Sequence, residues 1–352
     1  MKCRPARMKD FRNSAQTGTG PRLEPSEAHR KAPNEALLAV RDLNVHFPLP
    51  GRPEPVRAVD GVSLEVRRGE TLALVGESGC GKSTLARAIV GLVAPTSGEL
   101  RFEGEKLGTL GSRGRRALCQ KLQMVFQDPD ASLDPRRTIG DAVSEAVELH
   151  AKLTPRELAS RVVELLENVG IDRALETRYP HELSGGQKQR VCIARALAPG
   201  PRLLVCDEAV SALDVSIQAQ ILNLLSELKE RLQLSYLFIS HDLRVVRHLA
   251  DRVAVMYLGQ VVETAPASEL FGAPAHPYTR ALLDAVPNVT GGERPKATLA
   301  GEVPSPANPP RGCRFHPRCP SVMDRCRREA PELYALGTRT SRCFLSEPPD
   351  PA

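Results

Sequence analysis

The sequence predicts an α/β protein built on a doubly wound parallel sheet. One sign is an apolar strand at residues 71–75 that runs directly into a glycine-rich loop and then a helix. Another is the unbroken apolar stretch at 203–206, which is typical of a strand buried on both faces. From there to residue 257, helix and strand patterns alternate. Such alternation places helices on both faces of a mostly parallel sheet.

The other elements follow from hydrophobic periodicity along the chain. Alternating or continuous apolar residues predict strands, and apolar residues spaced three or four apart predict helices. In chain order the expected strands are 37–47, 62–66, 71–75, 100–102, 123–126, 203–206, 236–239 and 253–257. The expected helical segments are 83–91, an insert over 139–170, 216–232 and 243–249.

Shifts in composition divide the chain into three parts. Residues 1–35 are basic and turn-rich and have no hydrophobic period, so we expect a disordered tail. Residues 36–285 carry the sheet and helix patterns. Residues 286–352 hold 12 of the 30 prolines, so this part cannot form long helices or central strands. The chain is therefore expected to have one main domain and a C-terminal extension.

Composition also bears on where the protein works. Charged residues make up 26% and hydrophobic residues 41% of the chain, as in ordinary globular proteins. No apolar run approaches the roughly eighteen residues that cross a bilayer, and the N-terminus lacks the apolar core of a secretory signal. We therefore expect a cytoplasmic protein. The net charge of +6 is too common to indicate a partner.

The loop after the first buried strand fits the pattern G-x-x-x-x-G-K-[ST]. Its glycines allow backbone N–H groups to turn toward phosphates, and the helix that follows adds its positive dipole end. Lys82 can reach the β- and γ-phosphates, and the Ser83 hydroxyl is placed to ligate Mg²⁺. The sequence therefore predicts a nucleotide site formed by Gly76, Glu77, Ser78, Gly79, Cys80, Gly81, Lys82, Ser83 and Thr84.

Two acids follow the apolar stretch at 203–206. Asp207 at the carboxyl end of a buried strand can hold Mg²⁺, and Glu208 can orient and activate a water molecule. An apolar run followed by two acids is common and carries little weight alone. Together with the phosphate loop it predicts hydrolysis of a nucleoside triphosphate.

The segment Leu183-Ser184-Gly185-Gly186-Gln187 starts a helix, which Ser184 is also suited to cap. This segment resembles the signature motif of ATP-binding-cassette (ABC) ATPases, and the resemblance extends over residues 37–345. It implies an ABC-type P-loop NTPase with a RecA-like doubly wound sheet and N-terminal antiparallel strands. It further implies a helical subdomain at about 128–190 and a Cys/Pro-rich C-terminal extension.

The resemblance also implies roles for single residues. Glu208 polarises the attacking water, His241 contacts the γ-phosphate, and Gln127 senses the Mg²⁺ that Ser83 and Asp207 hold. Asp214 lies in the D-loop, and Phe47 stacks on adenine. Each has a plainer alternative: Gln127 as a loop amide, His241 as a helix cap, and Phe47 as a core residue.

In this family the signature segment closes over the nucleotide of a second subunit. Because the helix N-terminus is an anion site, Ser184, Gly185, Gly186 and Gln187 are expected to contact the partner's ATP in a head-to-tail dimer. Where the family usually has proline after the catalytic glutamate, this chain has Ala209. The change removes no catalytic group, so we expect ATP hydrolysis to survive it.

Three further stretches resemble the oligopeptide/dipeptide branch of importers, which also includes nickel importers: 127–136, 276–280 and 312–320. The resemblance implies peptide import through two polytopic permease subunits, with an identical or paralogous ATPase subunit and, indirectly, a solute-binding protein. It places the chain peripherally on the cytoplasmic face of the inner membrane. Import of nickel or another solute stays open. An ABC ATPase acting on nucleic acid or ribosomes is the alternative of another class. Those proteins typically carry two cassettes in one chain or DNA-contacting insertions, whereas this chain has one phosphate loop and one signature motif.

Four cysteines crowd the extension with the spacing C-x5-C-x6-C-x16-C: Cys313, Cys319, Cys326 and Cys343. This is not a zinc-finger spacing, and so proline-rich a segment is expected to need a staple. Related importer ATPases carry an iron–sulfur cluster here, which makes a [4Fe–4S] site the leading hypothesis. Zinc and free thiols stay open as alternatives.

Overall fold

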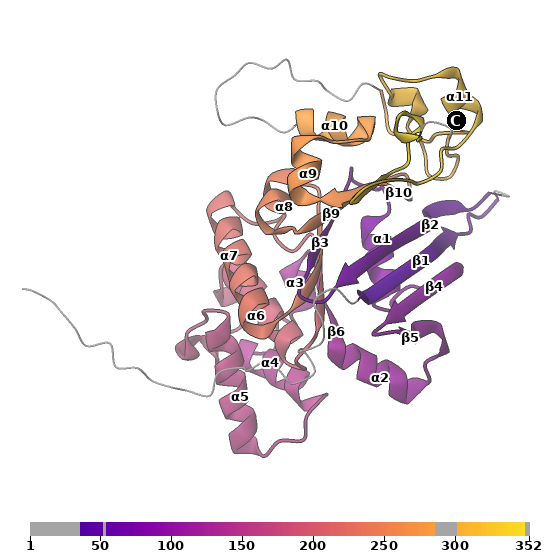
Figure 1. The fold of residues 1–352 in the computed structure, drawn as a ribbon. Coiled ribbons are helices and arrows are strands. Elements are labelled where there is room, and N and C mark those ends of the chain that lie inside the picture. The colour runs from indigo at the N-terminus through magenta and orange to yellow at the C-terminus, as the bar shows by residue number, and fades with distance from the viewer. Residues whose placement is uncertain (1–35, 52–53, 286–300, 349–352) are drawn as a thin grey trace, which may run out of the picture.

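The protein is described by a computed structural model that covers residues 36–51, 54–285 and 301–348. The basic tail predicted at 1–35 and the junction at 286–300 lie outside these described residues. Figure 1 shows two sheets, a helical region at one end and the C-terminal extension at the other. This arrangement confirms the predicted α/β class.

An antiparallel sheet is built from the N-terminal strands β1 (Ala36–Phe47), β2 (Val56–Arg67), β4 (Ser97–Phe102) and β5 (Glu105–Lys106). The strand order is β2-β1-β4-β5. In β1 and β2, buried residues largely alternate with exposed or half-buried ones. This pattern leaves one face of the sheet for the core, and it confirms the expected N-terminal antiparallel strands.

The second sheet has the order β11-β12-β10-β9-β3-β8-β7-β6. Strands β9, β3, β8, β7 and β6 run parallel to one another, whereas β10 is antiparallel to β9. Every residue of β3, β7 and β8 is buried, which explains their continuous apolar sequences. The bounds are β3 (Thr71–Val75), β6 (Leu122–Val125), β7 (Leu203–Asp207), β8 (Ser235–Ser240), β9 (Arg252–Tyr257), β10 (Gln260–Pro266), β11 (Tyr334–Leu336) and β12 (Arg339–Ser341).

Helices cover the parallel sheet and form the region between β6 and β7. Their bounds are α1 (Lys82–Ile89), α2 (Ser112–Lys121), α3 (Pro129–Ser132), α4 (Ile139–Glu148), α5 (Pro155–Asn168), α6 (Gly185–Leu197), α7 (Val215–Leu232), α8 (Leu243–Leu249), α9 (Ala267–Gly272), α10 (Pro277–Asp284) and α11 (Asp324–Arg328). Short 3-10 turns are η2 (Leu107–Thr109), η3 (Arg173–Leu175), η4 (Pro180–Glu182), η5 (His316–Arg318) and η6 (Phe344–Ser346). Within the described residues, none of these helices combines the length and apolarity needed to span a membrane.

The helical period at 139–170 is divided between α4 and α5. Thr154 caps α5 in a box with Glu157, and Pro155 occupies the first helical position. Proline there has no N–H to donate to the preceding turn, so α4 cannot continue into α5. A second capping box, between Thr138 and Asp141, starts α4.

The two sheets are tied together by a partly buried ion cluster around Glu103, in the turn between β4 and β5. Arg68 and Lys121 donate hydrogen bonds to its carboxylate at 2.6 and 2.8 Å, and Arg202 donates a third. Burial alone would raise the pKa of Glu103, but these three cations lower it to about 2. The cluster therefore fixes the turn against the entry of β7.

The C-terminal extension adds strands that its proline content does not predict. β12 pairs with β10 through Glu263 and Ser341, and β11 pairs with β12. Each strand is only three residues long and lies at the end of the sheet, where an interrupted ladder is tolerated. The extension thereby continues the sheet that carries the phosphate loop (Figure 1).

Candidate functional site

The glycine-rich loop lies between β3 and α1, as predicted. Gly76 and Gly81 both have positive φ, at 154° and 108°. A Cβ on Gly76 would lie 2.2 Å from the Met256 carbonyl oxygen, and one on Gly81 would lie 2.0 Å from that of Ala58. Any side chain at either position would collide with backbone. Glycine is therefore needed both for the loop conformation and for its contact with neighbouring strands.

Lys82 and Ser83 begin α1 and face the loop and the end of β7. The buried Lys82 ammonium donates to the carbonyl oxygens of Gly76 and Glu77 at 2.8 and 2.9 Å. The Ser83 hydroxyl donates to Asp207 Oδ1 at 2.9 Å. Burial raises the pKa of Asp207, and the Ser83 hydrogen bond opposes that rise. A hydroxyl and a carboxylate side by side are the hard oxygen donors that fit Mg²⁺, whose remaining ligands are usually phosphates and water.

Glu208 follows Asp207 and is brought together with two residues far away in the chain. Gln127 Nε2 donates to Glu208 Oε2 at 3.2 Å, and His241 Nδ1 lies 3.4 Å from the same oxygen. Gln127 follows β6 and His241 follows β8, the two neighbours of β7 in the sheet. Glu208 itself has a φ of 48°, a left-handed conformation that is strained for a non-glycine residue. The backbone of Glu208 is thus held in an energetically unfavourable conformation, and two neighbours contact its carboxylate.

Residues of the phosphate loop, Gln127 and Glu208 border one cavity of about 250 Å³, whereas Asp207 and His241 are not among its lining residues. Eight of its lining residues were predicted: Ser78, Gly79, Gly81, Lys82, Ser83, Thr84, Gln127 and Glu208. Three were not: Val56, Ala58 and Pro306. Gly76, Glu77 and Cys80 belong to the loop without lining the cavity. No local motif marks the three missed residues, because each reaches the cavity only through tertiary contact.

The predicted adenine-stacking residue lies outside the cavity lining. Phe47 is the last residue of β1 and is 41% exposed, so it is not a core residue. It pairs across the sheet with Val56, which does line the cavity. Phe47 is therefore one strand away from the wall, and stacking on adenine stays a prediction.

The signature segment is not part of this cavity. Ser184 caps α6: its hydroxyl accepts from Gln187 N–H at 3.3 Å, and its N–H donates to Gln187 Oε1 at 2.9 Å. A Cβ on Gly186 would lie 2.5 Å from Ile217 of α7, so this glycine allows α6 and α7 to pack closely. Ser184, Gly185 and Asp214 are exposed, and Asp214 starts α7. The chain does not bring these residues to its own phosphate loop.

The stretch 276–280 starts α10. His276 is buried and caps this helix by accepting the Tyr278 N–H at 3.0 Å on Nδ1. The N–H groups of Ala275 and His276 in turn donate to the Glu263 carboxylate at 2.8 and 2.9 Å. Burial lowers the pKa of His276 to about 4, which keeps the ring neutral and able to accept. This arrangement fixes the position of Tyr278.

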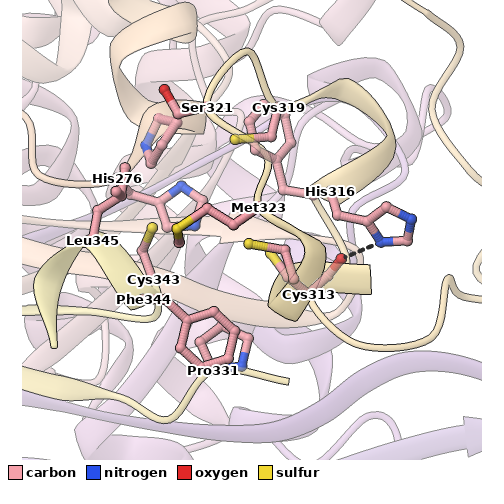
Figure 2. A pocket seen from close by; sticks show the side chains of 13 residues that line it. His276, Cys313, His316, Cys319, Ser321, Met323, Pro331, Cys343, Phe344 and Leu345 are labelled. Atoms are coloured by element: carbon pink, nitrogen blue, oxygen red, sulfur yellow. Dashed lines mark hydrogen bonds between the residues drawn. The ribbon is translucent and has the colours of Figure 1, made fainter. Parts of the chain in front are cut away.

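All four C-terminal cysteines border one small cavity, and Figure 2 shows Cys313, Cys319 and Cys343 reaching it from separate parts of the extension. Burial raises the pKa of Cys313 to about 11, so it is a protonated thiol at neutral pH. The cavity measures about 10 Å³, room for one water molecule at most.

The four thiols are free, and among the described residues no group of three or more His, Cys, Asp or Glu side chains is arranged to hold a metal ion. This arrangement of the cysteines gives the predicted [4Fe–4S] cluster no support.

A phosphate loop, an acidic strand end and a separate exposed signature helix on this fold define an ABC-type ATPase cassette. Residues 59–211 match the family model described as ABC transporter, and residues 262–326 match the one described as oligopeptide/dipeptide transporter, C-terminal region. The oligopeptide transport ATP-binding protein AppF of Bacillus subtilis is 49% identical over 86% of this chain and 94% of its own length. The di/tripeptide transport ATP-binding protein DppF of Pseudomonas aeruginosa is 48% identical over 89% and 98%.

A solved structure agrees with these relatives. The ATP-binding cassette MJ0796, in a dimeric post-hydrolysis state bound to ADP and Pi, has a TM-score of 0.58 and is 28% identical. The match covers 65% of this chain and 98% of MJ0796. The chain belongs to the ABC transporter family and is an ATP-hydrolysing cassette.

Proposed function

We propose that this chain binds and hydrolyses ATP to power import of di- or oligopeptides through separate membrane permease subunits. The observation that carries the ATPase part is that Lys82, Ser83, Gln127 and Glu208 line one cavity and that Asp207 accepts a hydrogen bond from Ser83. The peptide part is supported by the oligopeptide/dipeptide transporter region at 262–326 and by the peptide-transport relatives.

In this proposal the phosphate loop binds the triphosphate. Residues of the loop and of the first turn of α1 line the cavity, and the Lys82 ammonium is hydrogen-bonded to carbonyl oxygens of the loop. A phosphate seated there meets a fixed positive charge and the N-terminal end of a helix. Mg²⁺ held by Ser83 and Asp207 would supply charge neutralisation on the phosphates.

Glu208 is proposed as the group that orients the attacking water and accepts its proton. One oxygen of its carboxylate, Oε2, accepts a hydrogen bond from Gln127 and lies close to His241 Nδ1. The side chain of His241 is 55% exposed, so it is free to reach a phosphate presented from the cavity side. Positioning by two neighbours limits the reorganisation that Glu208 needs during the reaction.

Completion of the site by a second subunit follows from the exposed signature segment. The N-terminus of α6 is a capped helix start with Ser184 and Gly185 at the surface, which is an anion-binding geometry without a ligand from its own chain. We propose that it closes over the nucleotide of an identical or paralogous subunit. The dimeric ADP-bound state of MJ0796 supports this arrangement by analogy.

The membrane partners are proposed to dock near Gln127. The stretch 131–136 includes the end of α3 and leads into the helical region, so it connects the cavity to the surface of that region. Two polytopic permease subunits, with an indirectly associated solute-binding protein, would place the chain peripherally on the cytoplasmic face of the inner membrane.

Reconstitution tests the proposal. Vesicles containing the chain with its co-purified permease subunits and partner ATPase are expected to take up labelled di- and oligopeptides only with ATP inside the compartment that holds the cassettes. Peptide-independent nickel uptake would assign another solute, and DNA-stimulated hydrolysis without membrane association would contradict the importer proposal. A cofactor at the four cysteines stays a prediction, which iron, sulfide and zinc assays on the same preparation would check.

A further inference from the structure

We propose that the C-terminal extension, together with Tyr278 of α10, completes the nucleotide site of its own chain: Arg318 and Tyr278 position the phosphate loop through Glu77, and Pro306 forms part of the cavity wall. This inference rests on the proposed nucleotide site. It assigns a positioning role to residues that lie more than two hundred positions from Glu77 in the sequence.

Glu77, the second residue of the phosphate loop, is bound from two sides. Its backbone N–H donates to the Tyr278 hydroxyl oxygen at 3.0 Å. Its carboxylate receives two parallel hydrogen bonds from Arg318, Nη1 to Oε2 at 2.7 Å and Nη2 to Oε1 at 3.0 Å. A bidentate, charge-assisted pair fixes orientation as well as distance. Both contacts therefore restrain the loop at the same residue.

The arginine is itself held rigidly. Its side chain is only 4% exposed, and its guanidinium lies 6.0 Å from the centre of the Tyr257 ring. The rings of Tyr257, Tyr278 and Phe315 pack together, with centroids 4.6, 5.4 and 5.3 Å apart for the three pairs. The hydrogen bonds with Glu77 raise the pKa of Arg318, so it stays charged. A buried cation on a packed aromatic base is a fixed anchor, not a mobile surface contact.

A second arginine of the extension fastens this base to the nucleotide-binding domain. Arg314 donates to the carboxylate of Asp60 in β2 and to the carbonyl oxygen of Leu258, which follows β9. The β2 segment that carries Asp60 also contributes Val56 and Ala58 to the cavity. The extension thus contacts both sides of the nucleotide cavity: Arg318 binds the phosphate loop, and Arg314 binds the strand that carries Val56 and Ala58.

Pro306 brings the extension into the cavity itself. Its carbonyl oxygen accepts from the Arg57 N–H at 3.3 Å, which places Pro306 beside Val56 and Ala58 in the lining. These three residues present apolar surface, whereas the phosphate loop presents N–H groups and a cation. An apolar wall suits the nucleoside part of ATP, and the loop suits the triphosphate. Pro306 and Arg318 should therefore affect different parts of the same ligand.

Linkage makes the arrangement testable. If the docked extension favours nucleotide binding, bound nucleotide must favour docking by the same factor. Arg318→Gln is expected to weaken binding of a fluorescent ATP analogue to the full-length chain by about tenfold, because it removes a charge-assisted bidentate pair. Glu77→Gln should give a loss of similar size. The double variant should be little worse than either single variant, since both remove one interaction.

Inorganic tripolyphosphate separates the two proposed roles. Arg318→Gln should weaken binding of both ATP and tripolyphosphate, whereas Pro306→Gly should weaken ATP binding by a few-fold and leave tripolyphosphate binding unchanged. Arg318→Lys keeps the charge but not the bidentate geometry and should give an intermediate loss. Arg328→Gln, an exposed arginine in α11, is the matched control and should stay within about twofold of the wild type.

Two results would overturn the inference. One is unchanged ATP affinity in Arg318→Gln with an unaltered melting temperature. The other is full additivity of the Glu77→Gln and Arg318→Gln effects. If Arg318→Gln does not fold, Arg318→Lys and Glu77→Gln replace it in the test. Unchanged ATP affinity in both variants, or full additivity of their effects, would then overturn the inference. A wild-type chain that binds neither ATP nor tripolyphosphate would instead contradict the proposed nucleotide site, which keeps the two failures distinct.

Discussion

Replacing Glu208 by glutamine removes one negative charge and almost no volume. The amide oxygen can still accept from Gln127, which lies 3.2 Å away in the wild type, so the shape of the site should persist. The contact with His241 at 3.4 Å involves a half-exposed ring, and its loss should change the free energy of unfolding by less than about 1 kcal/mol. ATP binding should change little, because Lys82 and Ser83 are untouched.

Hydrolysis should respond very differently. A glutamine cannot accept the proton of the attacking water, and loss of a positioned base typically costs about 10²–10⁴-fold in rate. We therefore expect kcat for ATP hydrolysis to fall by about that factor while the dissociation constant of ATP stays within about threefold. With ATP bound and not turned over, the cassette should accumulate as an ATP-dependent dimer, alone or with its partner subunit.

The assay combines phosphate release, equilibrium binding of a fluorescent ATP analogue, and size measurement by light scattering with and without ATP. Glu227→Gln, an exposed glutamate on α7, is the matched control and should behave as the wild type in all three. A Glu208→Gln variant that keeps more than about a tenth of the wild-type rate would show that Glu208 is not the base. Loss of ATP binding would show that its charge is needed for binding instead.

Three further predictions concern stability and hydrolysis. Because the pKa of Glu103 is lowered to about 2, its ion cluster stabilises the folded state at pH values above the ordinary pKa of 4.5. This stabilisation is lost as the pH falls toward 2 and the carboxylate takes up a proton. Urea unfolding should therefore show Glu103→Gln to be destabilised at pH 7, by about 1–2 kcal/mol because solvent screens this partly exposed cluster, with the difference from wild type shrinking below about pH 4.5. Gly186→Val would drive a side chain into Ile217 of α7 and should lower stability by about 1–3 kcal/mol in the same assay; an unchanged unfolding curve would contradict the close α6–α7 packing. Ala209→Pro should leave ATP hydrolysis within a few-fold of wild type, and a large gain in rate would mean that the native alanine impairs the site.

Short stretches of sequence carried most of the fold. The unbroken apolar residues of β3 and β7, and the glycines at 76 and 81, predict a buried strand, a phosphate loop and a helix because each depends on a window of about ten residues. The α/β class was therefore predictable from local pattern, and the signature motif added the family and, through it, the antiparallel N-terminal strands. The division of the helical period at Pro155 was also readable from local chemistry, although the prediction treated 139–170 as one segment.

That Gln127, His241 and Glu208 belong to one site was predicted only through family resemblance. No local pattern links residues 81 and 33 positions away from Glu208; the parallel order β6-β7-β8 places the three strand ends side by side. The close contacts themselves come from tertiary structure. Their catalytic roles stay predictions.

By itself, then, the sequence determined the central strands, the helices that follow them and the loop predicted to receive phosphate, because backbone preference and hydrophobic period are local properties. Only the tertiary structure decided what surrounds that loop. Pro306, Tyr278 and Arg318 reach it because β12 joins the sheet edge and an aromatic cluster packs beneath the extension. Contacts between segments so distant depend on how the whole chain packs, and no short motif encodes them.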